Sequence, residues 1–196
     1  MDERRSVTEE YPRNFFQRRN SLLWRVPIVC EAITAAYQPK TVVDAGCAIG
    51  DLVQGFLELG VDAYGIEGSE AARDYLVVPE KRIFWRDLRT PIDVGSFDLA
   101  VCFEVIEHID ERYEDVLLEN LTSLSDAVVC SIAGPGQKGH RHVNLKPYEY
   151  WEDKFLELGF ERDAETEERL KHSWSRWRDT KGIKAYYGNL RCFQKG

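Results

Sequence analysis

The stretch of residues 41–51 constrains the fold of this chain more than any other part of its sequence. Thr41 and the two valines after it favour a β-strand. Gly46 and Gly50 then permit a tight turn, in which a ligand can approach bare backbone. From Leu52 onward the apolar residues recur with helical spacing. A strand, a glycine turn and a helix in this order form the ligand-binding corner of doubly wound α/β folds.

The charges at this turn indicate which kind of ligand it binds. A dinucleotide site has the pattern G-x-G-x-x-G and places a pyrophosphate at the N-terminus of the helix. Here Ala48 replaces the second glycine and Asp51 lies where the phosphate would sit, which disfavours an NAD-dependent oxidoreductase. Asp44, at the end of the strand, adds a second carboxylate to the same crevice. The turn suits a ligand with a cationic end and no phosphate, and S-adenosylmethionine fits this description.

Residues 42–50, V-V-D-A-G-C-A-I-G, resemble the first motif of the class I S-adenosylmethionine-dependent methyltransferases, usually D-x-G-x-G-x-G. Ala48 departs from that pattern. The resemblance covers about residues 40–194. It implies an α/β fold with a doubly wound, seven-stranded, mostly parallel sheet in the order 3-2-1-4-5-7-6, with strand 7 antiparallel and helices on both faces.

Acidic residues follow the next two expected strands, residues 61–67 and 82–86. Glu67 can accept hydrogen bonds from both ribose hydroxyls through its two oxygens. In the family, an acid at the position of Asp87 accepts a hydrogen bond from the adenine amino group, and the backbone of the next residue meets the ring. The resemblance implies cofactor contacts at Asp44, Ala45, Gly46, Cys47, Gly50, Asp51, Glu67, Gly68, Asp87, Leu88, Phe103 and Glu104.

A second motif begins with a nearly continuous apolar segment that is typical of a central strand buried on both faces. Residues 97–109, F-D-x-x-x-x-x-E-V-x-E-H-h, resemble a signature of class I methyltransferases that act on small molecules. The pattern [DNS]-P-P-[YFW], with which DNA amino-methyltransferases grip an extruded base, occurs nowhere in the chain. The resemblance therefore implies a small-molecule acceptor, such as a sugar or a natural product, with O-methylation slightly favoured.

The acceptor side is expected in the long polar loop of residues 133–147, because loops after parallel strands carry ligand contacts. The pattern G-H-x-H-V-N-x-x-P-x-x-Y-W in and after this loop resembles a motif in a subset of bacterial and phage methyltransferases. A hydroxyl acceptor needs a base, and the candidates are His142, His108 and Glu104. The alternative for both histidines is structural, by ordering the loop or capping a turn. His140 and His142 lack a third ligand at metal-binding spacing, so we expect no metal site.

The chain is expected to form a single domain over residues 1–196, with a Rossmann-like core over residues 40–194. Residues 1–38 are expected to form a helical N-terminal segment. By resemblance, residues 10–25 of this segment are a candidate lid over the cofactor; the alternative is an accessory helix packed on the core.

Three further elements are expected from local patterns. Residues 22–36 read as a helix that Pro27 would start or kink. Ser69 reads as the N-cap of a helix over residues 70–76. Residues 186–194 read as the last strand.

Composition bounds the partners of the protein. The net charge of −8 argues against tight, non-specific binding to nucleic acid. Five cysteines without a C-x-x-C pattern indicate a reducing cytoplasm, and burial is expected for the three in or beside apolar strands. No apolar run approaches the roughly 18 residues of a membrane span, and no signal-peptide pattern is visible. We therefore expect a cytoplasmic enzyme with a small-molecule acceptor and no membrane partner; the sequence does not indicate the oligomeric state.

Two other functions remain open at this point. A protein or RNA methyltransferase is supported only by the arginine- and aromatic-rich N-terminal segment, and the acidic body opposes it. A non-catalytic protein that binds S-adenosylmethionine or its product S-adenosylhomocysteine would keep the same cofactor residues.

Overall fold

The computed structural model describes residue 11 and residues 13–196. Its strands form one seven-stranded sheet in the order β3-β2-β1-β4-β5-β7-β6. The strands are β1 (Thr41–Ala45), β2 (Asp62–Glu67), β3 (Ile83–Trp85), β4 (Leu99–Phe103), β5 (Ala127–Ser131), β6 (Phe160–Arg162) and β7 (Leu190–Lys195). Strand β7 pairs antiparallel with β5 and β6, and the other pairs are parallel. The predicted strand order and directions are confirmed.

The central strands are buried on both faces, as their apolar sequences require. All residues of β4 and β5 are buried, and in β1 only Thr41 is partly exposed. A parallel sheet in water needs such strands because helices cover both of its faces. The register places the C-terminal ends of β1, β2 and β4 at the same edge of the sheet.

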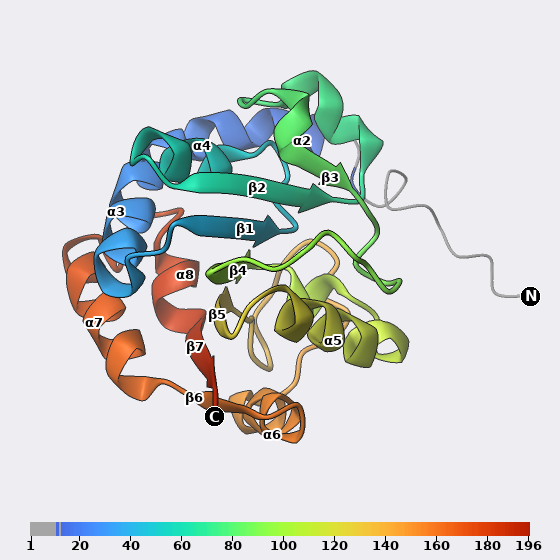
Figure 1. The fold of residues 1–196 in the computed structure, drawn as a ribbon, viewed down its shortest axis with the longest axis vertical. Helices are drawn as coiled ribbons and strands as arrows, with labels where there is room; N and C mark the ends of the chain where they lie inside the picture. The colour runs from blue at the N-terminus through green and yellow to red at the C-terminus, as the bar shows by residue number, and fades with distance from the viewer. Residues whose placement is uncertain (1–10, 12) are drawn as a thin grey trace, which may run out of the picture.

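Helices cover the two faces of the sheet in separate groups (Figure 1). On one face, α3, α4, α7 and α8 pack in one hydrophobic core, and on the other face α5 and α6 pack in a second. The helices are α2 (Arg13–Arg19), α3 (Val26–Tyr37), α4 (Asp51–Glu58), α5 (Glu114–Leu124), α6 (Tyr148–Glu157), α7 (Ala164–Trp174) and α8 (Lys184–Asn189). The predicted arrangement with helices on both faces is therefore confirmed.

Three local predictions differ from the structure. The segment after β2 is a 3-10 helix over Glu70–Tyr75, and the Ser69 side chain does not cap it, because its hydroxyl donates to the backbone oxygen of Tyr11 at 3.2 Å. The first part of the predicted helix over residues 22–36 is also 3-10, and α3 begins at Val26 with Pro27 in its first turn. The last strand begins at Leu190 rather than at residue 186.

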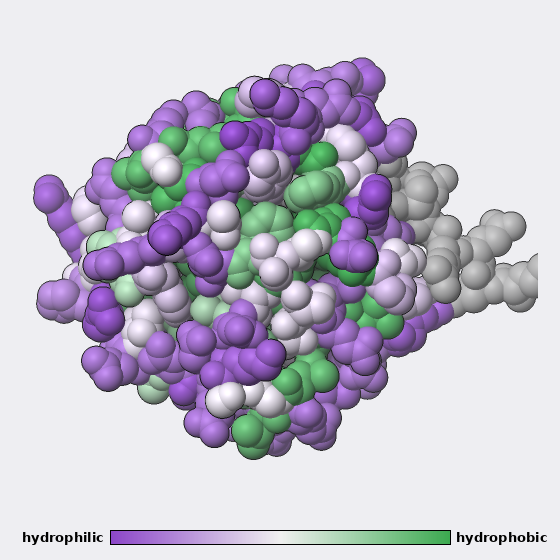
Figure 2. Space-filling model, in the orientation of Figure 1, coloured by the Kyte–Doolittle hydropathy of each residue, from purple (hydrophilic) through white to green (hydrophobic). Residues whose placement is uncertain are grey.

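The surface agrees with the acidic, polar composition. The face in Figure 2 is mostly hydrophilic, with smaller hydrophobic areas between the charged side chains. All five cysteines are buried and unpaired, whereas burial was expected only for the three in or beside apolar strands. Among the helices formed by residues 13–196, none combines the length and the apolar character that a membrane crossing requires.

Candidate active site

The glycine corner between β1 and α4 has the tight geometry that its sequence indicates. Gly46 has a φ of +82°, and its amide and that of Cys47 donate to the carbonyl of Ile66 at 2.9 and 3.0 Å. A Cβ at position 46 would lie 2.5 Å from a methyl group of Val105. Only glycine combines this φ with this close approach, so the backbone of the corner is exposed to whatever lies beside it.

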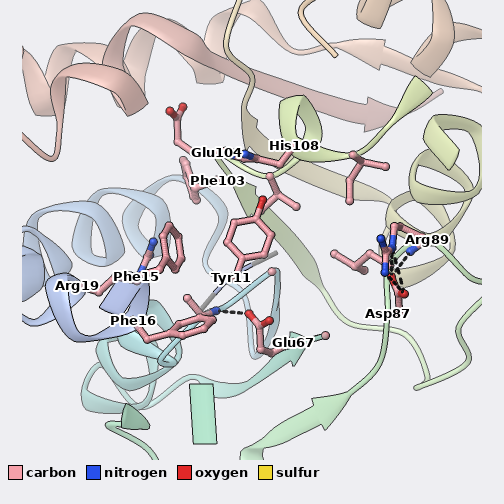
Figure 3. A pocket seen from close by; sticks show the side chains of 16 residues that line it. Tyr11, Phe15, Phe16, Arg19, Glu67, Asp87, Arg89, Phe103, Glu104 and His108 are labelled. Carbon is pink, nitrogen blue, oxygen red and sulfur yellow. Dashed lines mark hydrogen bonds and ion pairs between the residues drawn. The ribbon is translucent and has the colours of Figure 1, made fainter. Parts of the chain in front are cut away.

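A cavity of about 700 Å³, including its open mouth, lies beside this corner (Figure 3). The cavity joins the ends of β1, β2, β3 and β4 to the N-terminal segment. Its lining residues are Tyr11, Phe15, Phe16, Arg19, Gly46, Ala48, Glu67, Gly68, Asp87, Leu88, Arg89, Phe103, Glu104, Val105, His108 and Ile109.

The predicted cofactor residues divide into two groups by their position at this cavity. Those that line it are Gly46, Glu67, Gly68, Asp87, Leu88, Phe103 and Glu104. Those that do not line it and instead form the corner behind it are Asp44, Ala45, Cys47, Gly50 and Asp51. The predicted catalytic residues Glu104 and His108 line the cavity, whereas His142 contacts the ring of His108 from outside it.

Glu67 is held rigidly by the backbone around it. Its two carboxylate oxygens accept hydrogen bonds from the amides of Ala48 at 2.9 Å and Ser69 at 2.6 Å. Burial raises the pKa of Glu67 to about 7, and these amides act in the opposite direction. Each oxygen retains a lone pair, so the carboxylate can still accept hydroxyl donors from a ligand.

The two aspartates of the corner are in different electrostatic environments. Asp51 forms ion pairs with Arg19 and Arg25, both at 3.3 Å. Burial opposes the ionisation of Asp51, but the two arginines outweigh it and lower its pKa. Asp44 forms no hydrogen bond or ion pair with another described residue, and burial, followed by the charge of Asp51, raises its pKa to about 8. The expectation that Asp51 offers a free charge is thus corrected: Asp44 is the carboxyl group left without a partner.

Asp87 also has a partner that the sequence did not indicate. The guanidinium of Arg89 donates to both of its carboxylate oxygens, with distances of 2.9–3.1 Å. The backbone amide of Arg89 donates to the same carboxylate at 2.9 Å. Both side chains line the cavity and lie together in Figure 3. Asp87 is therefore fixed in place by its own loop, with its remaining lone pairs available to a ligand.

Glu104 is positioned by a network that spans three parts of the chain. Its backbone has a φ of +56°, and its amide donates to the hydroxyl of Ser131 at 2.9 Å. Its carboxylate accepts a hydrogen bond from the amide nitrogen of Asn189 at 3.1 Å. The amide oxygen of Asn189 in turn accepts from Gln137 at 2.8 Å and from the hydroxyl of Tyr148 at 3.1 Å. The network joins the end of β4 to the polar loop and to α8.

His108 and His142 lie close together near the C-terminal end of β4. The rings of His108 and His142 lie 5.0 Å apart between centroids. The Nδ1 atom of His108 bonds the carbonyl of Arg141 at 3.1 Å, and that of His142 bonds the carbonyl of Gln137 at 3.0 Å. Burial, followed by the charges of His142 and His140, lowers the pKa of His108 to about 4. At pH 7 His108 is therefore neutral.

The N-terminal segment forms one wall of the cavity. The ring of Tyr11 projects into the space between Glu67 and His108 in Figure 3, and its centroid is 5.9 Å from that of His108. Phe15, Phe16 and Arg19 of α2 line the same wall. The described part of the candidate lid over residues 10–25 therefore lies beside the cavity, where a lid would act. Residues 1–10 and residue 12 lie outside the described residues.

Some site residues were missed because their partners are distant in the chain. Arg19 and Asp51 are separated by 32 positions, and Glu104 and Asn189 by 85. No spacing in a single sequence connects such pairs. Arg89 could have been found, since an arginine two residues after a strand-end acid can fold back on it.

The chain was compared with known proteins. A family model described as a methyltransferase domain matches residues 16–178, which is more than half of the chain. A search of curated protein sequences found no significant match.

Solved structures with the same fold include methyltransferases with different acceptors. A TehB-like S-adenosylmethionine-dependent methyltransferase from Corynebacterium glutamicum is 20% identical, with 93% of this chain and 97% of that chain covered and a TM-score of 0.68. Magnesium protoporphyrin IX methyltransferase from Synechocystis, solved with bound S-adenosylmethionine, is 22% identical over 76% and 74% of the two chains, with a TM-score of 0.56. The sugar N-methyltransferase KedS8 from Streptoalloteichus is 16% identical over 76% and 85%, with a TM-score of 0.60.

At these identities the solved structures establish the fold, and the family match establishes the kind of domain. Together they confirm the predicted enzyme class and its cofactor. The chain belongs to the methyltransferase domain family and is an S-adenosylmethionine-dependent methyltransferase of class I fold.

Proposed function

We propose that this protein transfers a methyl group from S-adenosylmethionine to an oxygen atom of a small-molecule acceptor, such as a sugar or a natural product. The observation that carries the proposal is the single cavity that joins the strand-end acids Glu67 and Asp87 to His108. The likeness of residues 104–108 to the small-molecule signature supports the choice of acceptor class.

The donor side of the cavity fits the groups of the cofactor. Asp44 lies behind the corner and does not line the cavity, but its buried carboxyl group has no hydrogen-bond or ion-pair partner among the described residues, which suits the ammonium group. Arg19 is a cation at the cavity wall and suits the carboxylate of the same amino-acid end. Glu67 suits the ribose hydroxyls, and Asp87 with Leu88 suits the adenine edge. The close approach at Gly46 leaves the backbone of the corner open to the ligand.

The acceptor side is formed by aromatic and histidine side chains. Tyr11, whose ring packs edge-on against His108, and Phe15 narrow the cavity on this side, and a narrowed cavity favours a small acceptor over a macromolecule. The cofactor, when bound, supplies an electrophilic methyl group on a sulfonium. In this proposal the residues of the chain align the acceptor and exclude water, and the candidates to hold or receive the hydroxyl proton are His108 and Glu104, which line the cavity, and His142, whose ring contacts that of His108.

The proposal also includes the cellular setting expected from the sequence. The five buried, unpaired thiols support a reducing compartment, because exposed or paired cysteines are more typical of secreted domains.

A thermal shift experiment tests the donor half. S-adenosylhomocysteine at about 100 times its Kd should stabilise the protein by about 2.7 kcal/mol, and NAD should leave the Tm unchanged. Asp44→Asn should abolish most of the shift, whereas Asp126→Asn, an exposed aspartate paired with Lys195, is the matched control and should retain it. Stabilisation by NAD alone, or an unchanged response of Asp44→Asn, would overturn the assignment.

Turnover with a panel of acceptors tests the acceptor half of the proposal. Labelled S-adenosylmethionine is incubated with sugars, phenols, amines and RNA, and product formation is followed by mass spectrometry. Methyl transfer to a hydroxyl compound is the expected result. Transfer only to RNA, or only to nitrogen, would refute the proposed acceptor class.

A further inference from the structure

The buried carboxylate of Glu107 lies beside the cavity and has no role in the site described above. It belongs to the 3-10 helix Ile106–His108, directly after β4, and it is fully buried. Neither of its side-chain oxygens has a hydrogen-bond partner among the residues that the structure describes. Burial, followed by the charge of Glu104, raises the pKa of Glu107 to about 8, and the backbone amides of Glu107 itself and of Ala133 act in the opposite direction. A buried carboxylate without partners is unfavourable, so it points to a missing ligand.

Two histidines face this carboxylate with defined tautomers. In His108 and His142 the Nδ1 atom bonds a backbone carbonyl, and a carbonyl only accepts hydrogen bonds. The proton of each neutral ring is therefore on Nδ1, which leaves the lone pair on Nε2. Histidines that bind metals usually have this arrangement, with the other ring nitrogen donating to a carbonyl or carboxylate.

The three side chains converge on one point. The ligand atoms offered by Glu107, His108 and His142 all lie within 4.8 Å of one another. Ligands at roughly 2.1 Å from a metal are separated by roughly 3–3.5 Å, so a small inward movement of the side chains completes the site. The polar loop is also tied to this point, because the carbonyl of Glu107 accepts the amides of Val143 and Asn144 at 3.0 and 3.1 Å.

The loop places the ring of His142 directly against Gly139. A Cβ at Gly139 would lie 1.9 Å from Nε2 of His142, closer than any real contact. A side chain there would displace the ring, so glycine is required for this conformation.

We propose that Glu107, His108 and His142 bind a divalent first-row transition-metal ion at the acceptor end of the cavity. Two imidazole nitrogens and one carboxylate suit Mn²⁺, Fe²⁺, Co²⁺ or Zn²⁺ and leave coordination positions open. This proposal revises the expectation of no metal site. That expectation was based on His140 and His142, whereas the group in the structure combines His142 with His108 and Glu107.

The ion gives the proposed O-methylation a chemical basis, and in this respect the inference rests on the proposed function. A divalent cation lowers the pKa of an oxygen ligand, so an acceptor hydroxyl at an open position loses its proton to solvent. With the ion bound, His108 and His142 are ligands and no longer candidates for the base. The oxygen then forms a bond to the methyl carbon as the bond from that carbon to sulfur breaks, and the electron pair returns to sulfur. No redox change is involved. His108 lines the cavity, which places the metal site next to the acceptor.

The test measures metal binding directly and needs no acceptor. The full chain is treated with EDTA, dialysed and titrated with Mn²⁺, and the loss of the free-ion EPR signal gives stoichiometry and affinity. One ion per chain is expected. Glu107→Gln and His142→Ala should each weaken binding by at least about tenfold, since even second-shell changes in metal sites weaken binding about 10–100-fold. His172→Ala, at an exposed histidine of α7, is the matched control and should bind as the unaltered protein does.

Stabilisation by S-adenosylhomocysteine is measured on the same samples. It shows whether each variant is folded. If Glu107→Gln does not fold, His142→Ala remains as the test, because His142 is only partly buried. Absence of saturable Mn²⁺ and Zn²⁺ binding in the unaltered protein would overturn the metal site even if the cofactor still binds. Metal affinity in Glu107→Gln and His142→Ala that equals the affinity of the unaltered protein would overturn it as well. Failure of the unaltered protein to bind S-adenosylhomocysteine would refute the proposed function while leaving the metal measurement valid.

Discussion

The proposed contact between Asp44 and the ammonium group predicts how cofactor affinity changes with pH. In the cofactor-free protein burial and the charge of Asp51 raise the pKa of Asp44 to about 8, while Arg19 and Arg25 act in the opposite direction. An ammonium group beside Asp44 favours its ionised form, so binding at pH 7 releases a proton. Affinity for S-adenosylhomocysteine should therefore fall as the pH falls through the pKa of the free carboxyl group.

The size of the effect follows from the two raised pKa values. If only ionised Asp44 binds the ammonium group, lowering the pH from 8 to 6 weakens binding by about 50-fold, or about 2.3 kcal/mol. Glu67, with a pKa of about 7, adds about another tenfold over the same interval, if ribose hydroxyls require its ionised form. These factors are upper values, because each charge raises the pKa of the other.

Isothermal titration calorimetry with S-adenosylhomocysteine checks this directly. Kd is measured from pH 8 to pH 6, and measurements in two buffers of different ionisation enthalpy give the number of protons released. Asp44→Asn should bind more weakly at pH 8 and retain only the part of the pH dependence that Glu67 supplies. Affinity that is constant or increases at low pH, or a pH dependence unchanged in Asp44→Asn, would refute the assignment of Asp44 to the ammonium group.

Two further substitutions test the structure around the site. Glu167→Gln should lower the free energy of unfolding in urea by about 2 kcal/mol, because it removes the buried carboxylate that pairs with buried Arg191 and with the more exposed Arg162 and Lys171. The substitution of its exposed neighbour, Glu168→Gln, should change the free energy by less than about 0.5 kcal/mol, and equal effects would contradict the reasoning. Gly46 and Gly60 both have a positive φ, but only at position 46 would an alanine Cβ lie against Val105. Gly46→Ala should therefore lower stability more than Gly60→Ala and should also weaken cofactor binding. Equal losses of stability would show that backbone strain alone is responsible.

The fold was predictable because its strongest signals are local. The apolar runs of β4 and β5 are long enough to identify buried parallel strands, and the family resemblance supplied their order. The last strand was placed too early because Tyr186 and Tyr187 favour strands by local propensity. In the structure Tyr186 is in α8 and stacks on Phe103 at 4.5 Å between centroids. This tertiary contact overrides the propensity and cannot be read from neighbouring residues.

That Glu67 and Asp87, the acids proposed to bind the donor, lie close together was predictable for a topological reason. Parallel strands end at one edge of the sheet, so acids at the ends of successive strands become neighbours. Glu67 and Asp87 line one cavity for this reason. The acceptor half has no such rule, because its groups come from loops. Glu107 lies within the motif of residues 97–109, but the sequence indicates no role for it. Only the structure shows that His142 lies beside it.

Ala48 shows what the glycine pattern of the corner encodes. Its φ is +51°, in the left-handed region where an alanine costs about 1 kcal/mol and a glycine costs nothing. The amide of Ala48 donates to Glu67 at 2.9 Å, which holds the residue in that conformation. The corner therefore keeps the backbone shape of the glycine pattern although it has lost the glycine. Alanine in place of glycine at position 48 is therefore compatible with the proposed cofactor site. The strained backbone of Ala48 itself orients Glu67, the residue expected to bind the ribose.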